Sequence, residues 1–234
     1  MRISAGFFIL FFAAILNVCA NDTAQFSLAK KYLNGVYNVI SAKQQYIKAI
    51  AFTYSDKDLQ KPFEKAEFIM ARKGKCSFQS YNNLTSYSDD VKSLQIDTID
   101  KTIVISQPIL APMMNLKPDV LNQVTKIIFT DASKGTKSME LTFRPNCAYQ
   151  RIEMVFDTST FKLAKLNLWF IGQNEENAPE LRKMEINYLV IEDKVPNNIE
   201  VCSIDEILEF DKEKNIKIKK LTLKDYEIIN LFAN

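Results

Sequence analysis

The sequence predicts a mainly β protein with some helix (α+β): a strongly curved antiparallel sheet, or half-barrel, of about eleven strands after an N-terminal helix. The hydrophobic periodicity changes from helical to strand-like once, near residue 46. Strand-like segments then recur at hairpin spacing almost to the C-terminus. Residues 107–124 form the one long stretch without alternation, and we expect them to form a lid made of a loop and a short helix.

The composition favours a globular binding protein over an enzyme. The 234 residues are 47% hydrophobic and 25% charged, the net charge is +2, and there is no His. A nearly neutral chain lacks the basic clustering that nucleic acids require. The absence of His excludes His-dependent triads, dyads and zinc sites. Phosphate-loop, GxSxG and CxxC patterns are also missing. We therefore expect no enzymatic activity, no catalytic or metal site and no cofactor.

Residues 1–20 have the features of a cleavable signal peptide. Arg2 supplies a positive start, residues 7–16 (FFILFFAAIL) are apolar, and small residues precede the expected cut after Ala20. One alternative is a membrane anchor, but a span needs about 20 apolar residues. A second alternative is lipidation at Cys19. We expect a periplasmic or secreted protein without a stable membrane span, in which residues 21–234 form a single domain.

The cysteines beyond the signal peptide leave the disulfide state open. They are Cys76, Cys147 and Cys202. Their spacings fit no metal motif, and an odd number allows one bridge with a leftover thiol or no bridge at all.

The helix is expected over residues 26–45, with Ser27 as a cap, because apolar residues recur there at spacings of three and four. The expected strands are 46–54, 66–72, 75–81, 94–99, 102–106, 126–130, 138–143, 149–156, 161–170, 182–191, 201–210 and 216–221. A short helix is expected over residues 118–124, inside the lid. The C-terminal extension, residues 197–234, is apolar enough to pack on the domain.

The alternation places more large apolar side chains on the strands than one helix covers easily. One interpretation is an ordinary filled core. The other is a concave apolar cavity that binds acyl chains, for which flexible Met side chains are well suited. The candidate cavity residues are Phe52, Tyr54, Phe68, Met70, Arg72, Phe78, Met113, Met114, Phe143, Met154, Phe156, Leu168 and Phe170.

Three stretches resemble the LolA-type periplasmic lipoprotein carriers. In residues 66–78 (AEFIMARKGKCSF), Arg72 and Gly74-Lys75 match the end of the family's Arg-Pro-Gly-Lys strand, although Lys73 replaces the Pro. Residues 96–105 (IDTIDKTIVI) are similar to the family's Ser-Asp-Gly-Lys-Thr-Leu-Trp segment, without its Gly and its aromatic. The predicted late strands, 151–167 and 184–190, are similar to two paired late strands of the family. In the family the second of these strands ends in a Glu/Asp-Lys-Pro turn, and residues 192–196 (EDKVP) match that turn. The likeness covers most of residues 27–196.

This resemblance implies a monomeric carrier of lipid-modified proteins or other apolar ligands, whose partners are acyl chains and envelope proteins. It also implies that Arg72 hydrogen-bonds the backbone of the lid and holds the empty cavity closed. The residues alone equally allow Arg72 to be a charge at a strand end that reaches solvent. An interaction scaffold with the same fold and a filled core is the alternative function, and a hydrolase without a recognisable motif is a third.

Overall fold

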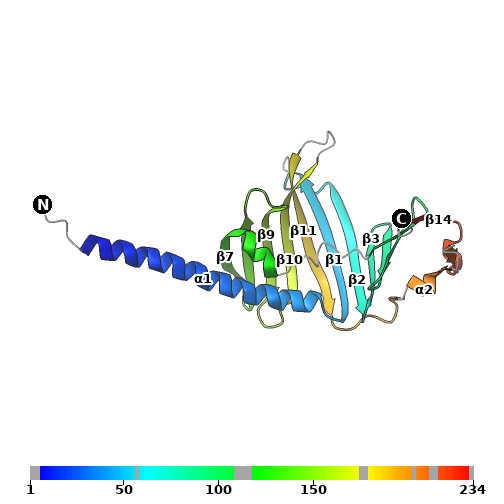
Figure 1. Cartoon of the computed structure of the whole chain (residues 1–234), viewed down its shortest axis with the longest axis horizontal. Helices are drawn as coiled ribbons and strands as arrows, with labels where there is room; N and C mark the ends of the chain where they lie inside the picture. The colour runs from blue at the N-terminus through cyan, green and yellow to red at the C-terminus, as the bar shows by residue number, and fades with distance from the viewer. Residues whose placement is uncertain are drawn as a thin grey trace.

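The computed structural model describes residues 6–55, 58–107, 118–173, 179–201, 204–210 and 216–231, with side chains from Thr23 onward apart from those of residues 118, 119, 173, 179, 210 and 221. A long N-terminal helix, α1 (Gly6–Ile40), runs along one end of a large curved sheet, and its first half projects beyond the sheet edge (Figure 1). The sheet is open and the strands predominate, which confirms the predicted fold class.

The main sheet has twelve strands in the order β14-β6-β5-β4-β3-β2-β1-β11-β10-β9-β8-β7. All neighbours are antiparallel except β14, which pairs in parallel with β6. The strands are β1 (Gln44–Ser55), β2 (Glu64–Lys73), β3 (Cys76–Tyr81), β4 (Leu84–Ser88), β5 (Ser93–Asp97), β6 (Thr102–Ser106), β7 (Val124–Ser133), β8 (Thr136–Phe143), β9 (Tyr149–Asp157), β10 (Leu163–Gln173), β11 (Pro179–Glu192) and β14 (Glu227–Asn230).

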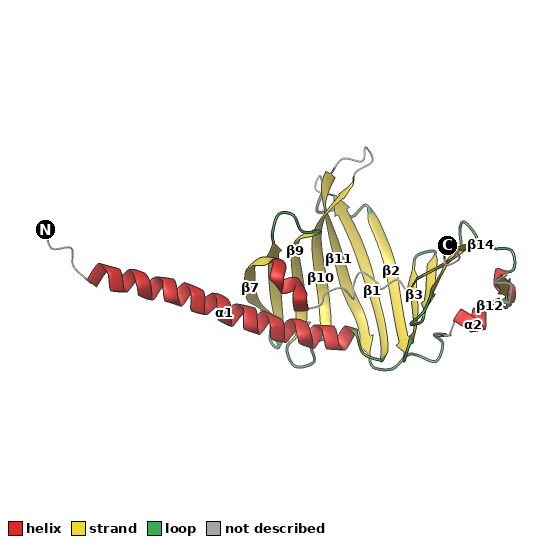
Figure 2. Cartoon of the chain, in the orientation of Figure 1, coloured by secondary structure: helices red, strands yellow, loops and turns green. Residues whose placement is uncertain are grey.

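The remaining elements lie in the lid and in the C-terminal extension. They are η2 (Pro118–Gln123), α2 (Ile204–Ile207), η3 (Leu221–Leu223) and the two-stranded sheet of β12 (Leu208–Phe210) and β13 (Ile216–Ile218). Figure 2 places α2 and β12 at the opposite end of the sheet from α1. Most of the lid, residues 108–117, lies outside the part of the chain that the structure describes.

The first hydrophobic core lies between α1 and the face of the sheet that α1 covers, here called the inner face. The helix contributes Ala29, Tyr32, Leu33, Val36 and Ile40, which recur at helical spacing. The sheet contributes alternate residues of β1, β2 and β7 to β11, such as Met70, Met154 and Leu166. The helix and the sheet are therefore held together by side-chain packing.

A second core lies on the opposite, outer face. The register pairs Ala71 with Phe78, Phe78 with Tyr87, and Tyr87 with Leu94. Directly paired residues share a face. Because Ala71 follows Met70 in β2, its side chain points away from the first core. The outer-face residues Leu94, Ile96, Ile103 and Ile105 pack against Ile204, Ile207, Leu208 and Leu223 of the C-terminal extension.

Several element predictions need correction. The predicted helix over residues 26–45 ends early, at Ile40, because Gln44 and Gln45 already pair with β2 as the start of β1. The short polar strand β4 was not predicted, since LTSYS has no apolar alternation. The predicted strand 201–210 contains α2 before β12 begins. The lid helix is a 3-10 helix, η2, as a short connector often is.

The helix α1 continues through the expected cleavage point at Ala20. None of the helices, within the searched residues, is both long enough and apolar enough to cross a membrane.

Candidate binding site

The structure divides the predicted cavity residues into three groups. Phe68, Met70, Arg72, Phe143, Met154, Phe156, Leu168 and Phe170 lie on the inner face. Phe52, Tyr54 and Phe78 lie on the outer face. Met113 and Met114 lie outside the described residues. The predicted cavity therefore does not form as one surface.

The centre of the inner face is filled by the chain's own side chains. Met154, Phe156 and Leu166 have 0% exposure beneath α1. At roughly 25 cal/mol per Å² of apolar surface, their burial is a major source of stability. The large central hollow expected from the sequence is thus closed in this conformation.

The strand β1 has the opposite orientation from the one predicted. Its buried residues are Gln45, Ile47, Ala49, Ala51 and Thr53, so Phe52 and Tyr54 point outward. Alternation separates two faces of a strand but does not say which face is inside. On the outer face, long side chains cover the aromatic rings: the Lys183 Nζ lies 5.0 Å from the Tyr54 ring centroid.

Ion pairs within β11 and between β10 and β11 stabilise this outer face. Glu185 Oε2 lies 3.0 Å from Lys165 Nζ and 3.1 Å from Lys183 Nζ. Burial alone would raise the pKa of Glu185, but hydrogen bonds from these lysines and from Asn187 lower it overall. The Arg151 guanidinium stacks 4.1 Å from the Trp169 ring centroid.

Arg72 and Gln45 hold the C-terminal end of α1 on the inner face. The two residues are paired across β1 and β2. Arg72 Nη1 donates to the Ser41 carbonyl at 3.2 Å, and Gln45 Nε2 donates to the Val39 carbonyl. The last carbonyls of a helix lack intrahelical donors and carry partial negative charge, so both contacts stabilise this end. Burial lowers the pKa of the Arg72 guanidinium, and Tyr37 opposes that shift.

Tyr32 anchors the C-terminal half of α1 through three aromatic contacts. Its ring centroid lies 5.0 Å from Phe156, 5.8 Å from Phe129 and 6.4 Å from Phe161. Phe161 comes from the turn between β9 and β10, where its φ is 56°. The same ring fills the space over Gly35, where a Cβ would lie 2.5 Å from Phe161 Cγ.

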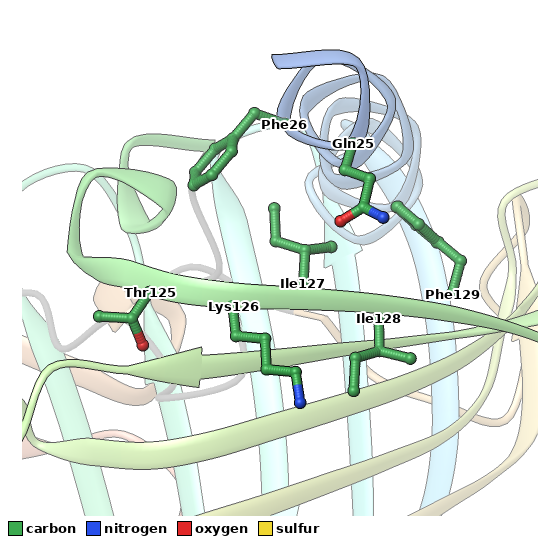
Figure 3. A pocket seen from close by; sticks show the side chains of 7 residues that line it. All are labelled: Gln25, Phe26, Thr125, Lys126, Ile127, Ile128 and Phe129. Atoms are coloured by element: carbon green, nitrogen blue, oxygen red, sulfur yellow. The ribbon is translucent and has the colours of Figure 1, made fainter. Parts of the chain in front are cut away.

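Two pockets open beside the N-terminal part of the α1 side chains that the structure describes. One pocket of about 430 Å³ runs along the edge strand β7 beside Gln25 and Phe26. In Figure 3, Gln25, Phe26, Ile127 and Phe129 point into the space between α1 and β7, whereas Lys126 points to the other side of β7. The side chains facing this gap are therefore mostly apolar.

A second pocket, of about 870 Å³, lies on the η2 side of Phe26. Its lining residues are Thr23, Phe26, Ser27, Lys30, Leu121, Asn122, Val124 and Arg144. Phe26 lines both pockets and is half-buried between them. Small-molecule sites typically occupy about 300–1,000 Å³, so each hollow is large enough for a ligand.

Sequence reasoning did not identify this site. It placed Phe26 at the start of the helix and residues 118–124 in the lid, but gave neither a binding role. The signal is absent because the pockets arise where the last strand of the sheet order, β7, lies beside α1. That proximity depends on the whole topology.

The disulfide state stays open. Cys76 and Cys147 are free thiols, and Cys202 lies outside the described residues.

Comparisons with known proteins find likeness in structure alone. No protein-family model matches the chain, and no curated protein matches its sequence. A conserved protein from Thermus thermophilus, described as uncharacterized, aligns with a TM-score of 0.46 at 8% identity, over 86% of this chain and 98% of that chain.

Two further matches have descriptive names. The Mycobacterium tuberculosis lipoprotein LppX aligns with a TM-score of 0.42 at 9% identity, over 73% of this chain and 98% of its own. A LolA superfamily protein from Nitrosomonas europaea aligns with a TM-score of 0.32 at 11% identity, over 73% and 96%. The LolA likeness expected from the sequence is thus found again, and it concerns the fold.

Proposed function

We propose that this protein is an exported, non-enzymatic binder and carrier of an apolar ligand, such as the acyl chain of a lipid or of a lipid-modified protein. The observation that carries the proposal is the pair of hollows beside Phe26, which adjoin the first core between α1 and the sheet. The resemblance of the sequence to LolA-type carriers implies the same class of ligand. The signal-like residues 1–20 support export.

The way in which α1 covers the sheet fits such a role. Contacts between side chains, together with the Arg72 and Gln45 hydrogen bonds, join the helix to the inner face. Moving a helix off a sheet breaks no strand ladder, so the inner face can open while the sheet stays intact. A long chain is then accommodated by displacing the part of α1 around Phe26, where the packing already leaves space.

Filling the hollows tests the proposal. Gln25 and Ser27 are exposed and line one pocket each, so Gln25→Trp and Ser27→Trp place a bulky ring in the space with little effect on the core. Asn34→Trp is the matched control, on an exposed site of the same helix. We expect uptake of a fluorescent palmitate analogue by the parent and by Asn34→Trp, and weakened uptake by both pocket variants. Equal uptake by all four proteins would refute the site.

An interaction scaffold is the second candidate function, and the filled centre of the inner face favours it. The outer face offers a surface for partners, because Trp, Tyr and Arg side chains such as Trp169, Tyr54 and Arg151 are enriched in protein interfaces. A scaffold would take up no acyl chain in the fluorescence experiment, whereas a carrier would. The same measurement therefore separates the two functions.

A further inference from the structure

The pocket on the η2 side of Phe26 has a charge pattern that simple binding of an apolar chain does not require. Lys30 of α1 and Arg144, directly after β8, line this pocket together. Among the described residues, neither Asp nor Glu lines either hollow. An apolar ligand alone would not need two cations at its binding site.

These two cations have no acidic partner within the part of the chain that the structure describes. Ion pairs elsewhere involve Lys48, Lys75, Lys92, Lys137, Arg151, Lys165, Arg182, Lys183 and Lys220. Other exposed lysines are also unpaired. Lys30 and Arg144 differ from those because they share a hollow with the apolar side chains Phe26, Leu121 and Val124.

The backbone fixes Arg144 at this place. Its N–H donates to the Gln123 carbonyl at 3.1 Å, which joins the end of β8 to the end of η2. Lys30 lies four residues after Phe26 on α1, so both side chains project from the same side of the helix. Hydroxyl and amide groups of Ser27 and Asn122 complete the polar part of the lining.

We propose that the ligand is a single-chain anionic amphiphile, with its chain against Phe26 and the apolar lining and its anionic head between Lys30 and Arg144. This inference rests on the proposed function and specifies the class of ligand. Both cations are exposed, so each contributes modestly and the contribution is screened by salt. The charges therefore select among ligands of equal chain length more than they set the affinity.

Isothermal titration with probes that share one chain tests the proposal. The probes are dodecyl phosphate, dodecanoate, dodecyl maltoside and dodecyltrimethylammonium, each below its micelle concentration, together with ethyl phosphate as a head without the chain. We expect either or both anionic probes to bind about threefold to tenfold more tightly than the neutral one, with a difference that shrinks as salt is added. The two anionic probes distinguish a fatty-acid head from a phosphate head.

Variants assign the preference to the two side chains. Lys30→Gln with Arg144→Gln is expected to bring anionic and neutral probes to nearly equal affinity while binding of the neutral probe persists. Lys31→Gln is the matched control, because Lys31 is an exposed lysine of the same helix and lines neither pocket. This control should keep the preference.

Three results would overturn the inference. Equal binding of all the dodecyl probes by the parent would reject charge selection and leave the proposed function intact. Binding of ethyl phosphate as tight as that of dodecyl phosphate would indicate a simple anion site. No binding of any dodecyl probe would reject both the inference and the proposed function.

Discussion

At the scale of single residues, Arg72 connects the end of α1 to the sheet. The hydrogen bond between its guanidinium and the Ser41 carbonyl reaches the turn after α1. Arg72 thus fastens the helix that covers the inner face. Its expected hydrogen bond to the lid backbone stays a prediction, because residues 108–117 lie outside the described part of the chain.

Arg72→Leu is expected to speed the release of a bound acyl chain more than it lowers stability. A hydrogen bond from a charged group contributes about 1.5–3 kcal/mol, and half-burial places Arg72 near the lower end. Urea unfolding and the rate of probe release are the two measurements. Arg72→Lys, which keeps a donor, is the control. Proportional losses of stability and of ligand retention would reject the latch.

Asp157 organises the turn that presents Phe161 to α1. Its Oδ1 accepts hydrogen bonds from Ser159 N and Oγ and from Thr160 N and Oγ1. Hydrogen bonds from these two residues, first of all from the Ser159 hydroxyl, lower the pKa of Asp157 from 3.8 to about 2. A carboxyl whose folded pKa is depressed stabilises the fold above its unfolded pKa and loses that effect as the pH falls.

Asp157→Asn is therefore expected to lower stability at pH 7, and the difference from the parent should shrink between about pH 4 and pH 2. Urea unfolding midpoints across this range provide the measurement. Asp193, an exposed carboxylate without such hydrogen bonds to the described residues, supplies the control Asp193→Asn. A difference that stays constant down to pH 2 would show that the turn does not depend on the charge.

At the scale of elements, Gly35 determines how closely α1 approaches the β9–β10 turn. Replacing a helical Gly by Ala ordinarily stabilises a protein by about 0.5–1 kcal/mol. Here the new Cβ would lie 2.5 Å from ring atoms of Phe161, so we expect Gly35→Ala to destabilise by about 1–3 kcal/mol. Adding Phe161→Ala should reduce the penalty of the first change. Asn38→Ala, on the exposed side of α1, is the control and should not destabilise the protein. A stabilising effect of Gly35→Ala would contradict the contact between Gly35 and Phe161.

The C-terminal extension is an element of the fold because it completes the second core. Ile207 is 1% exposed against the outer face of the sheet, so Ile207→Ala is expected to cost about 2–4 kcal/mol. In this variant, exchange of backbone amide hydrogens should accelerate first in β4 to β6, which the extension covers, and not in α1. Ile229→Ala, at a site 39% exposed, is the control. Unchanged exchange in β4 to β6 would show that the extension does not support them.

The sequence was sufficient for the helix, the hairpins and the open sheet, because each rests on local periodicity. It failed where alternation alone cannot say which face of a strand is buried. In β1, Phe52 and Tyr54 alternate with Ala49 and Ala51, and the prediction placed the larger, aromatic side chains inside. The polar strand β4 gave no signal. The hollows beside Phe26 depend on the meeting of α1, β7 and η2, which are distant in sequence.

At the scale of the whole molecule, one curved sheet is covered on opposite faces at its two ends. The helix α1 covers the inner face from β7 to β2, and the C-terminal extension covers the outer face from β3 to β6. Each end thus has its own core. Of these two covering elements, only α1 borders the hollows beside Phe26, so its end of the molecule is where we place ligand binding.

Photo-cross-linking tests this placement most directly. A palmitate analogue with a diazirine at the chain end, bound to the purified protein and irradiated, labels the residues that touch the chain, and mass spectrometry locates the adducts. We predict adducts on Phe26, Leu121 and Ile127, abolished by an excess of palmitate. Adducts on the outer-face residues Phe52, Tyr54 and Trp169, or labelling that palmitate does not compete away, would contradict the account.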